Sequence, residues 1–359
     1  MSRVRVGVIG CGGIAQVQHL PHLRELEDRF EIAAVCDVSP QLVEFIGDMY
    51  GVPARFTDYR ALVEHDLDGV LLCHSDPKTD AVVEALEAGK HVFIEKPMCY
   101  STEEGDAIVE AARKAGKVAM VAYMKQHDPG YRYVKGQLKE VPDIRFIQVN
   151  HLHPDNRLHL EEFTLYRFDD VPSSVREENR VRREAAIKAA VGDVPSHVRA
   201  AFGTLAGSMI HDISSLRGLF GSPSQVVSVE IWREGRCISM VLAYERDKRC
   251  VATWADLPEL WDFRETLEVY GSARRVSIQF PTGFARGLPS PVTVQGSDEG
   301  GIPWKKEVVV NYQNAFKLEL IHFHECIVEG KTPITDVEGA RADAALMRDI
   351  VLAYLHQQR

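Results

Sequence analysis

The sequence lacks a concentrated positive charge, and it lacks any long uninterrupted apolar run. Its 359 residues include 42 Lys and Arg against 52 Asp and Glu, which gives a net charge of -10. Phosphate binding needs a concentrated basic surface, so this balance argues against a nucleic acid as partner. The basic cluster at 180–183 is flanked by glutamates and is typical of a solvated helix face. Because no apolar run approaches the roughly 18 residues that span a bilayer, we also expect no membrane partner.

Patterned cysteine is absent as well. The seven cysteines are irregularly spaced, and no CxxC pair occurs. Several lie in apolar runs, where cysteine behaves as a small hydrophobic residue. These features predict free thiols in a reducing compartment. The first apolar run begins within a few residues of Met1 and leaves no room for a signal peptide, so we expect a cytoplasmic protein.

The first 122 residues alternate between two patterns. Continuously apolar runs predict strands at 4–9, 31–36, 69–73, 91–94 and 118–122, and helical patterns lie between them at 14–26, 40–49, 79–88 and 102–115. Strands that are apolar throughout and alternate with helices imply a parallel sheet with both faces covered. The sequence therefore predicts an α/β Rossmann domain with a doubly wound parallel sheet over residues 1–122.

A glycine-rich turn follows the first predicted strand and opens the first predicted helix. It reads Gly10-Cys11-Gly12-Gly13-Ile14-Ala15. Gly10 permits the tight turn, Gly12 lets the backbone approach a pyrophosphate, and the small Ala15 allows close packing of helix on strand. The N–H groups at the start of the helix, from Gly13 and Ile14 onward, point at the phosphates. We therefore predict that this turn binds a nicotinamide dinucleotide.

Asp37 ends the second predicted strand, about 25 residues after the turn, near the usual spacing for an acid that binds ribose hydroxyls. A carboxylate there would repel a 2′-phosphate, and residues 38–40 supply no arginine. The sequence thus favours NAD over NADP. The alternative is that Asp37 only caps the next helix, although Ser39 could serve as that cap.

The segment 84–97 reads EALEAGKHVFIEKP and resembles a signature of the Gfo/Idh/MocA family, which includes glucose–fructose oxidoreductase and inositol dehydrogenases. The resemblance covers nearly the whole chain. It implies that Lys96 is catalytic and contacts substrate, that Glu95, Lys96 and Pro97 lie beside the cofactor, and that the Lys96–Pro97 peptide is often cis. A partly desolvated lysine at the carboxyl edge of the sheet can hold a hydroxyl group and move its proton. The simpler alternative is an exposed surface lysine.

The loop after the strand at 69–73 departs from the family pattern Thr-Pro-Asn-x-x-His. Here it reads Cys73-His74-Ser75-Asp76-Pro77-Lys78. The resemblance places this loop over the nicotinamide half of the cofactor. His74 is therefore a candidate cofactor contact whose chemistry differs from the family's.

Residues 123–359 are predicted to form a second domain of the α+β class. Alternating patterns predict strands at 146–152, 226–233, 237–244, 249–254, 265–270, 275–279 and 307–310. Successive strands with short turns indicate a large, mostly antiparallel open sheet. In the resembling family such a sheet often forms dimers, so we expect a homodimer or homotetramer. The charged stretch 155–200 is expected to be partly helical and to form a wall or lid of the substrate pocket.

His211 is the second catalytic candidate. It lies in the segment 208–221, which resembles the family helix that carries a catalytic, substrate-contacting histidine. A pKa of about 6.5 suits a base that removes a hydroxyl proton, although a lone histidine among apolar residues is more often a core residue. The chain has Gly207 and Ser214 where the family often has acids. Asp212 would project about 100° around the helix from His211 and is no obvious substitute.

Other polar residues could line the substrate pocket. They follow the last strand of the first domain and the first strand of the second: Tyr123, Lys125, His153, Asp155 and Asn156. Lys125 aligns with a position that is commonly basic in the family. His151 and His153 share one face of a strand and suggest a metal site, but no third ligand has a convincing spacing, so we predict no metal.

The leading functional prediction is an NAD-dependent oxidoreductase that moves a hydride between a sugar or cyclitol carbon and nicotinamide. Lys96 and His211 would handle the hydroxyl proton. One alternative is an NAD-dependent glycoside hydrolase, known among relatives of this fold, because an acid is missing at Gly207 and the 155–200 stretch is unusual. A non-enzymatic regulator that senses the nucleotide is a third alternative, but it would not need both Lys96 and His211. The expected partner of the enzyme is a small carbohydrate or cyclitol.

Overall fold

The computed structural model describes residues 3–75 and 77–358, and the chain forms two compact units. Unit 1 comprises residues 1–123, 163–192 and 316–345, and unit 2 comprises 124–162, 193–315 and 346–359. The predicted division treated everything after residue 122 as one second domain. The structure differs from that division because two later segments, 163–192 and 316–345, pack with the first 123 residues.

Unit 1 is built on a six-stranded parallel sheet in the order β3-β2-β1-β4-β5-β6. The strands are β1 (Val4–Ile9), β2 (Phe30–Cys36), β3 (Ala54–Phe56), β4 (Gly69–Leu72), β5 (His91–Glu95) and β6 (Ala119–Ala122). The strand order reverses between β1 and β4, and open α/β sheets bind ligands at the carboxyl ends of the strands at such a point. The predicted doubly wound parallel sheet is confirmed.

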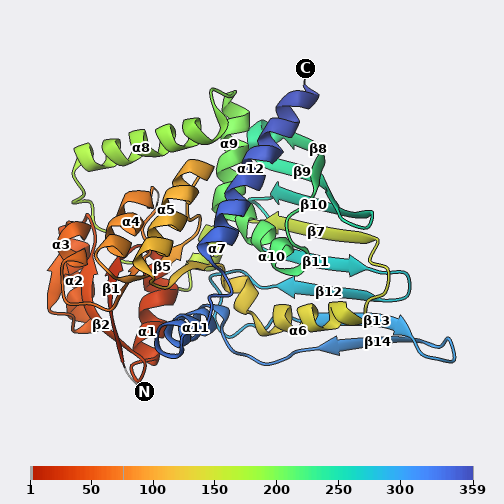
Figure 1. The fold of residues 1–359 in the computed structure, drawn as a ribbon, viewed down its shortest axis with the longest axis horizontal. Coiled ribbons are helices and arrows are strands. Elements are labelled where there is room, and N and C mark those ends of the chain that lie inside the picture. The colour runs from red at the N-terminus through yellow and green to blue at the C-terminus, as the bar shows by residue number, and fades with distance from the viewer. Residues whose placement is uncertain (1–2, 76, 359) are drawn as a thin grey trace. The chain divides into compact units, whose positions relative to one another are not determined.

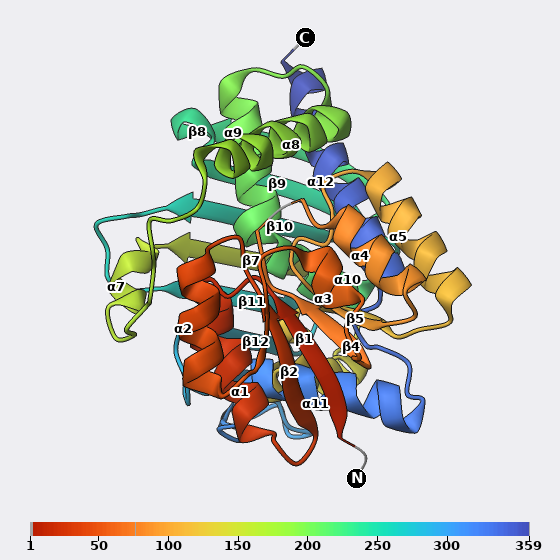
Figure 2. The ribbon, with the colours of Figure 1, turned by 90° about the vertical axis from the view of Figure 1, so that its left-hand side faces the viewer.

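The helices of unit 1 cover both faces of this sheet, with α1 and α2 on one side and α4 and α5 on the other (Figure 2). They are η1 (Ala15–His19), α1 (Leu20–Glu25), α2 (Pro40–Tyr50), α3 (Tyr59–Val63), α4 (Thr79–Glu87), α5 (Thr102–Ala115), α8 (Ser173–Val191) and α11 (Ala315–Glu329), and α12 (Val337–Gln357) begins in this unit. Caps set their ends: the Ser39 hydroxyl accepts from the N–H of Leu42, and Ser101 and Glu104 form a capping box. Strand β3 and helix α3 were not predicted, because each is too short to show a period.

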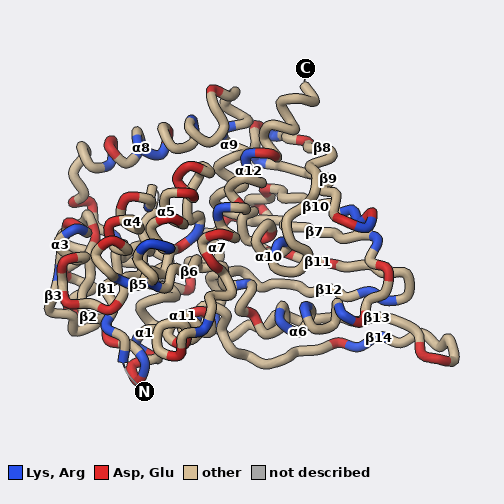
Figure 3. The backbone as a smooth tube through the Cα atoms, in the orientation of Figure 1, with Lys and Arg blue, Asp and Glu red and all other residues tan. Residues whose placement is uncertain are grey.

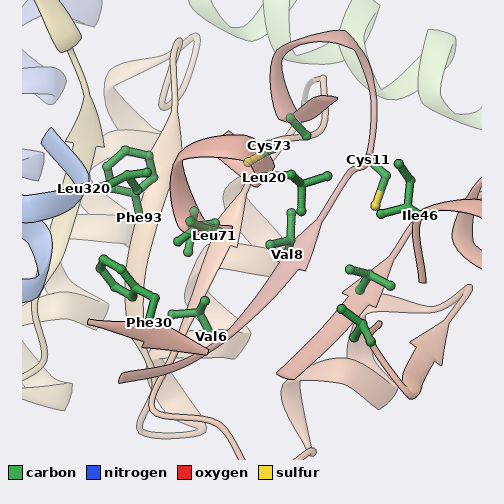
Figure 4. Packing of buried hydrophobic residues seen from close by; sticks show 14 of the residues in the cluster. Val6, Val8, Cys11, Leu20, Phe30, Ile46, Leu71, Cys73, Phe93 and Leu320 are labelled. Atoms are coloured by element: carbon green, nitrogen blue, oxygen red, sulfur yellow. The ribbon is translucent and has the colours of Figure 1, made fainter. Parts of the chain in front are cut away.

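The core of unit 1 joins residues that are far apart in the sequence. Val8, Leu71 and Phe93 from three neighbouring strands pack in one buried cluster with Leu320 and Phe323 of α11 (Figure 4). All five side chains are fully buried. Burying each such side chain contributes about 1.5–3 kcal/mol, which explains why the segment that carries α11 belongs to this unit.

Unit 2 is built on an eight-stranded sheet in the order β14-β13-β12-β11-β7-β10-β9-β8 (Figure 1). The strands are β7 (Phe146–His153), β8 (Gln225–Trp232), β9 (Cys237–Tyr244), β10 (Lys248–Asp256), β11 (Arg264–Tyr270), β12 (Arg275–Phe280), β13 (Val292–Ser297) and β14 (Pro303–Val308). Only β7 and β10 pair in parallel, which confirms a mostly antiparallel sheet. The strand predicted at 307–310 lies earlier, at β14, and β13 was missed because only Val292 and Val294 of its residues are buried.

The helices of unit 2 are η2 (Met124–His127), α6 (Pro129–Gln137), η3 (Leu138–Glu140), α7 (Asn156–Leu160), α9 (Ser196–Thr204), η4 (Leu205–Met209), α10 (Ile210–Phe220) and η5 (Arg233–Gly235). The last part of α12 also belongs here. The tyrosine of α6 ties this helix to α10, because the Tyr131 hydroxyl donates to the carbonyl of Ser215 over 2.8 Å. The side chain of Trp254 on β10 donates to the Ser208 hydroxyl, which holds η4 against the sheet.

The 155–200 stretch is partly helical, as expected, and contains α7, α8 and the start of α9. Along α8 basic and acidic residues are interleaved (Figure 3), and Arg180 pairs with Glu177 and Glu184. The basic cluster is therefore a solvated helix face.

All seven cysteines are buried free thiols. Within the residues that the structure describes, no helix is both long enough and apolar enough to cross a bilayer.

Candidate functional site

The glycine-rich turn lies between β1 and η1 in unit 1. Gly10 has a φ of 90°, and a Cβ atom there would lie 2.4 Å from the backbone nitrogen of His74, so only glycine fits. Gly12 and Gly13 differ, because a Cβ atom on either would meet nothing within 4 Å. The turn thus presents open backbone at the carboxyl edge of the sheet, as a pyrophosphate cradle requires. His74 is placed in the loop that closes against Gly10.

Asp37 lies beside this turn at the end of β2. One carboxylate oxygen accepts the backbone N–H of Cys11 over 2.8 Å, and the other accepts the N–H of Ser39 over 3.0 Å. Burial raises the pKa of Asp37, and these two backbone N–H groups oppose the rise. The side-chain cap of α2 is Ser39. Asp37 is therefore fixed next to the turn without acting as that cap, and both its oxygens retain further lone pairs for hydroxyl donors.

Lys96 follows the last residue of β5, and its Lys96–Pro97 peptide is cis. The buried carboxylate of Glu95 contacts His19 Nε2 over 2.7 Å and accepts the backbone N–H of Lys96 over 3.0 Å. Burial alone would raise the pKa of Glu95, but the hydrogen bond with His19 and the nearby lysine charges hold it below its ordinary value. The buried ammonium of Lys78 donates to the carbonyl of Pro97 over 3.2 Å. The Lys96 backbone is thus held from both sides.

His19 and Lys78 were not among the predicted site residues. His19 faces Glu95 from η1, and the sequence separates the two by 76 positions. No local pattern links residues that far apart, so only the packing of η1 against β5 could identify them. The position of Lys78 after a predicted strand was the one available signal.

Another acid is buried in the same unit, on α11. No described residue donates a hydrogen bond to either carboxyl oxygen of Glu319, which is fully buried. Burial raises the pKa of Glu319 well above its ordinary value, and the charge of Glu95 raises it further. Glu319 therefore holds its proton to a higher pH than an exposed glutamate does. It was not predicted, because the sequence around it is an ordinary apolar helix pattern.

In unit 2, His211 lies on α10, as predicted, and is partly exposed. The hydroxyl groups of Ser214 and Ser215 both donate to the His211 carbonyl, over 3.1 and 2.7 Å. Ser214, which stands where the family often has an acid, is therefore turned back onto its own helix. A Cβ atom on Gly207 would meet nothing within 4 Å, so the packing of the chain does not demand a glycine there.

Asp212 belongs to a buried network of polar side chains that the sequence did not predict. Its carboxylate contacts His151 Nδ1 over 2.7 Å, and His151 also lies 3.8 Å from a carboxylate oxygen of Glu265. The Lys125 ammonium forms an ion pair with the Glu265 carboxylate. All four side chains are buried. The network brings together residues from η2, β7, α10 and β11, which explains why spacing along the sequence could not reveal it.

Three members of this network have the atom types of metal ligands. The ligand-type atoms of His151, Asp212 and Glu265 lie within 4.8 Å of one another. The Lys125 ammonium, however, already engages Glu265. A divalent ion would have to compete with that ammonium group, so we propose no metal here.

The remaining predicted pocket residues lie in two environments. The His153 ring stacks on His151, with centroids 5.4 Å apart, and packs against Trp254 in a tilted arrangement, with centroids 5.6 Å apart. Its Nδ1–H donates to the carbonyl of Pro154, which leaves Nε2 as an acceptor, and burial and the charge of His151 lower its pKa to about 4. Asp155 caps α7, Asn156 begins that helix, and Tyr123 is buried at the end of unit 1. The positions of Asp155 and Asn156 are therefore explained by the start of α7.

The strand order and the glycine-rich turn are those of a Rossmann domain, and comparison with known proteins finds a similar family. Residues 4–123 match the Gfo/Idh/MocA model, described as "Oxidoreductase family, NAD-binding Rossmann fold". This part of the chain is similar to that family.

Two curated relatives are inositol dehydrogenases. The inositol 2-dehydrogenase/D-chiro-inositol 3-dehydrogenase of Shouchella clausii is 37% identical over 144 residues, which are 38% of this chain and 40% of the relative. The inositol 2-dehydrogenase of Salmonella typhimurium is 31% identical over 136 residues, which are 37% of this chain and 40% of the relative. These alignments span about 40% of the relatives' length.

Solved structures extend the likeness to the whole fold. KijD10, a 3-ketoreductase from Actinomadura kijaniata solved with NADP and TDP-benzene, superposes with a TM-score of 0.73 at 20% identity, covering 98% of each chain. An oxidoreductase from Thermotoga maritima gives a TM-score of 0.72 at 21% identity, covering 98% of this chain and 97% of the other. At this level of identity the likeness shows a shared fold only.

Proposed function

We propose that the protein is an NAD-dependent oxidoreductase that acts on a hydroxyl-bearing carbon of a sugar or cyclitol. The observation that carries the proposal is the open glycine-rich turn with Asp37 fixed beside it and Lys96 held at the same edge of the sheet. The relatives described above as inositol dehydrogenases support a cyclitol or sugar as substrate.

The proposal gives each catalytic candidate a role. The nicotinamide ring would take or return the hydride. Lys96 and His211 would hold the substrate hydroxyl and move its proton, because an amine and an imidazole can both exchange protons near neutral pH. Glu95 acts on Lys96 as a positioning residue, since its carboxylate accepts the Lys96 backbone N–H.

The cofactor we propose is NAD, with Asp37 binding the adenosine ribose. A homodimer or homotetramer formed through the eight-stranded sheet remains a prediction, which light scattering checks directly. The cytoplasmic location likewise remains a prediction. We do not propose glycoside cleavage as a second function, because neither inositol dehydrogenase named above is described as a glycosidase.

One experiment tests the proposal and separates it from that alternative. A panel of cyclitols, sugars, sugar acids and chromogenic glycosides would be incubated with the protein and NAD, with NADH absorbance and product analysis followed together. We expect NADH to form in proportion to a ketone product from a cyclitol or sugar. Aglycone release without net NADH would contradict the proposal, and so would the absence of any turnover with the whole panel.

A further inference from the structure

A segment that enters unit 1 late in the sequence, residues 163–170, lies against the glycine-rich turn. The side-chain amide of Gln16 in η1 donates to the carbonyl of Tyr166 over 3.0 Å and accepts the Tyr166 N–H over 2.9 Å. The same amide donates to the carbonyl of Cys11 over 2.8 Å. One glutamine therefore ties the turn and the late segment together.

Two aromatic residues of the segment anchor it on α2. The ring of Tyr166 packs on Phe45 with centroids 4.1 Å apart, and Phe168 lies 6.0 Å from the same ring. Both rings pack against the core cluster of unit 1. The segment is thus fixed in place by hydrogen bonds at one end and by apolar packing along its length.

This placement brings Asp170 to the start of α2. Its carboxylate accepts the Ser39 hydroxyl, and it also accepts the backbone N–H of Gln41 over 2.7 Å. The first N–H groups of a helix have no partner within the helix, and together with the helix dipole they favour an anion. In this chain that anion is the Asp170 carboxylate, supplied from a residue 129 positions later.

Ser39 connects Asp170 to Asp37. Its backbone N–H donates to Asp37, and its hydroxyl donates to Asp170. Two carboxylates therefore flank one serine where β2 leads into α2. Asp37 is the residue proposed to bind the adenosine ribose, so a phosphate on the ribose 2′-oxygen would enter a region where the helix start is already occupied by a negative charge.

We propose that Asp170 is a cofactor-specificity residue, which fills the anion-binding start of α2 and, together with Asp37, disfavours a dinucleotide that carries a 2′-phosphate. The inference rests on the proposed function, because it assumes that the turn binds a nicotinamide dinucleotide. It extends that function by giving the choice between NAD and NADP to a residue outside the Rossmann motif. Like-charge contacts at a binding site are an effective means of rejecting the wrong ligand.

The test measures binding of NADH and NADPH to the full-length protein by quenching of tryptophan fluorescence, without any substrate. The wild type should bind NADH at least about tenfold more tightly than NADPH. Asp170→Asn, which keeps the shape of the side chain and removes its charge, should strengthen NADPH binding by about tenfold and change NADH binding by less than about threefold. Asp170→Glu should keep the preference for NADH.

A neighbouring aspartate provides the matched control. Asp169 is exposed and pairs with Arg176 over 3.0 Å, away from the start of α2. Asp169→Asn removes the same charge from the same segment and should leave the ratio of the two affinities unchanged.

Four results would overturn the inference. They are a wild type that binds both dinucleotides equally, an Asp170→Asn variant with the wild-type ratio, an equal loss of both affinities in that variant, and an Asp169→Asn variant that relaxes the ratio as much. In each of these cases NADH still binds, so the proposed function stands. If the wild type binds neither NADH nor NADPH, the inference and the proposed function both fail.

Discussion

Each unit of the molecule buries one histidine–carboxylate pair, and each pair stands next in sequence to a catalytic candidate. In unit 1, Glu95 contacts His19 over 2.7 Å and precedes Lys96. In unit 2, Asp212 contacts His151 over 2.7 Å and follows His211. The two pairs share a contact distance and a nearly complete burial.

The units differ in how they accommodate a second buried acid. In unit 1 the second acid is Glu319, which holds its proton to a higher pH because burial and the charge of Glu95 raise its pKa. In unit 2 the second acid is Glu265, which is bonded to the Lys125 ammonium. A buried carboxyl group must be either neutral or paired, and the molecule shows one example of each. The comparison predicts that the stability of unit 2 depends on Lys125, whereas the stability of unit 1 depends on pH through Glu319.

The largest expected effect is on turnover and concerns Lys96, which follows the Glu95–His19 pair of unit 1. Lys96→Ala should lower turnover by about 10²–10⁴-fold, the range typical of a lost proton-transfer group. The affinity for NADH should change little, and steady-state kinetics together with fluorescence titration would measure both quantities. Lys114→Ala, which removes an exposed lysine paired with Glu110, is the control and should behave as wild type. A Lys96→Ala variant within threefold of the wild-type turnover would rule out the role of Lys96.

The next effect is on the stability of unit 2. Lys125→Met leaves Glu265 buried without its partner, so the free energy of unfolding should fall by about 3–5 kcal/mol. Adding Glu265→Leu should recover most of the loss, because the unpaired charge is then gone. Denaturant unfolding measures both variants. Arg113→Met, which breaks the exposed pair with Glu110, should change stability little. An Lys125→Met variant as stable as this control would show that the buried pair contributes nothing.

The stability of unit 1 should depend on pH through Glu319. Its raised pKa means that the native state holds a proton that the unfolded state releases, so stability falls as the pH rises from about 4.5, the unfolded value, toward the native value. Glu319→Gln removes this fall. The variant should therefore gain more stability over wild type at pH 8 than at pH 5, as measured by denaturant unfolding at the two values. Parallel pH dependences for the two proteins would contradict a raised pKa.

The smallest effect is a titration within unit 2. His153 has a pKa of about 4, mainly because it is buried and also because the charge of His151 opposes its protonation. His151→Gln should raise the pKa of His153 toward the ordinary value, as followed by NMR of the imidazole protons. His159→Gln removes a weaker influence and should raise it less. An unchanged His153 titration in His151→Gln would mean that His151 carries no charge in the folded protein.

The sequence predicted the parts of the site that depend on neighbouring residues. The turn at Gly10, the acid at Asp37 and the Glu95–Lys96–Pro97 segment each follow a predicted strand, and the structure places each at the end of its strand. Both sheets were also predicted, because continuous apolar runs indicate buried parallel strands and alternation indicates antiparallel strands with two unlike faces. Strand β3 has three residues and none of them is buried, and β13 has only two buried valines, so neither gave enough apolar positions to show a period.

Contacts between residues far apart in the chain could not be predicted from the sequence. The prediction treated Asp212 only in relation to His211, one position away, whereas its partner is His151, 61 positions away. Likewise, the 155–200 stretch was expected to be a wall or lid of the pocket. The structure shows that residues 166–170 are fixed on the glycine-rich turn and α2 within unit 1, and the lid remains a prediction.

By itself, the sequence determined that this chain has a glycine-rich turn, an adjacent acid and a lysine at the edge of a parallel sheet, because backbone geometry and strand–helix periodicity act over a few residues. Only the tertiary structure decided which groups neutralise the buried acids and which residue occupies the start of α2. Those outcomes depend on the folding of segments 60 to 150 positions apart onto one another. Burial and charge compensation are properties of that packing, and no local pattern encodes them.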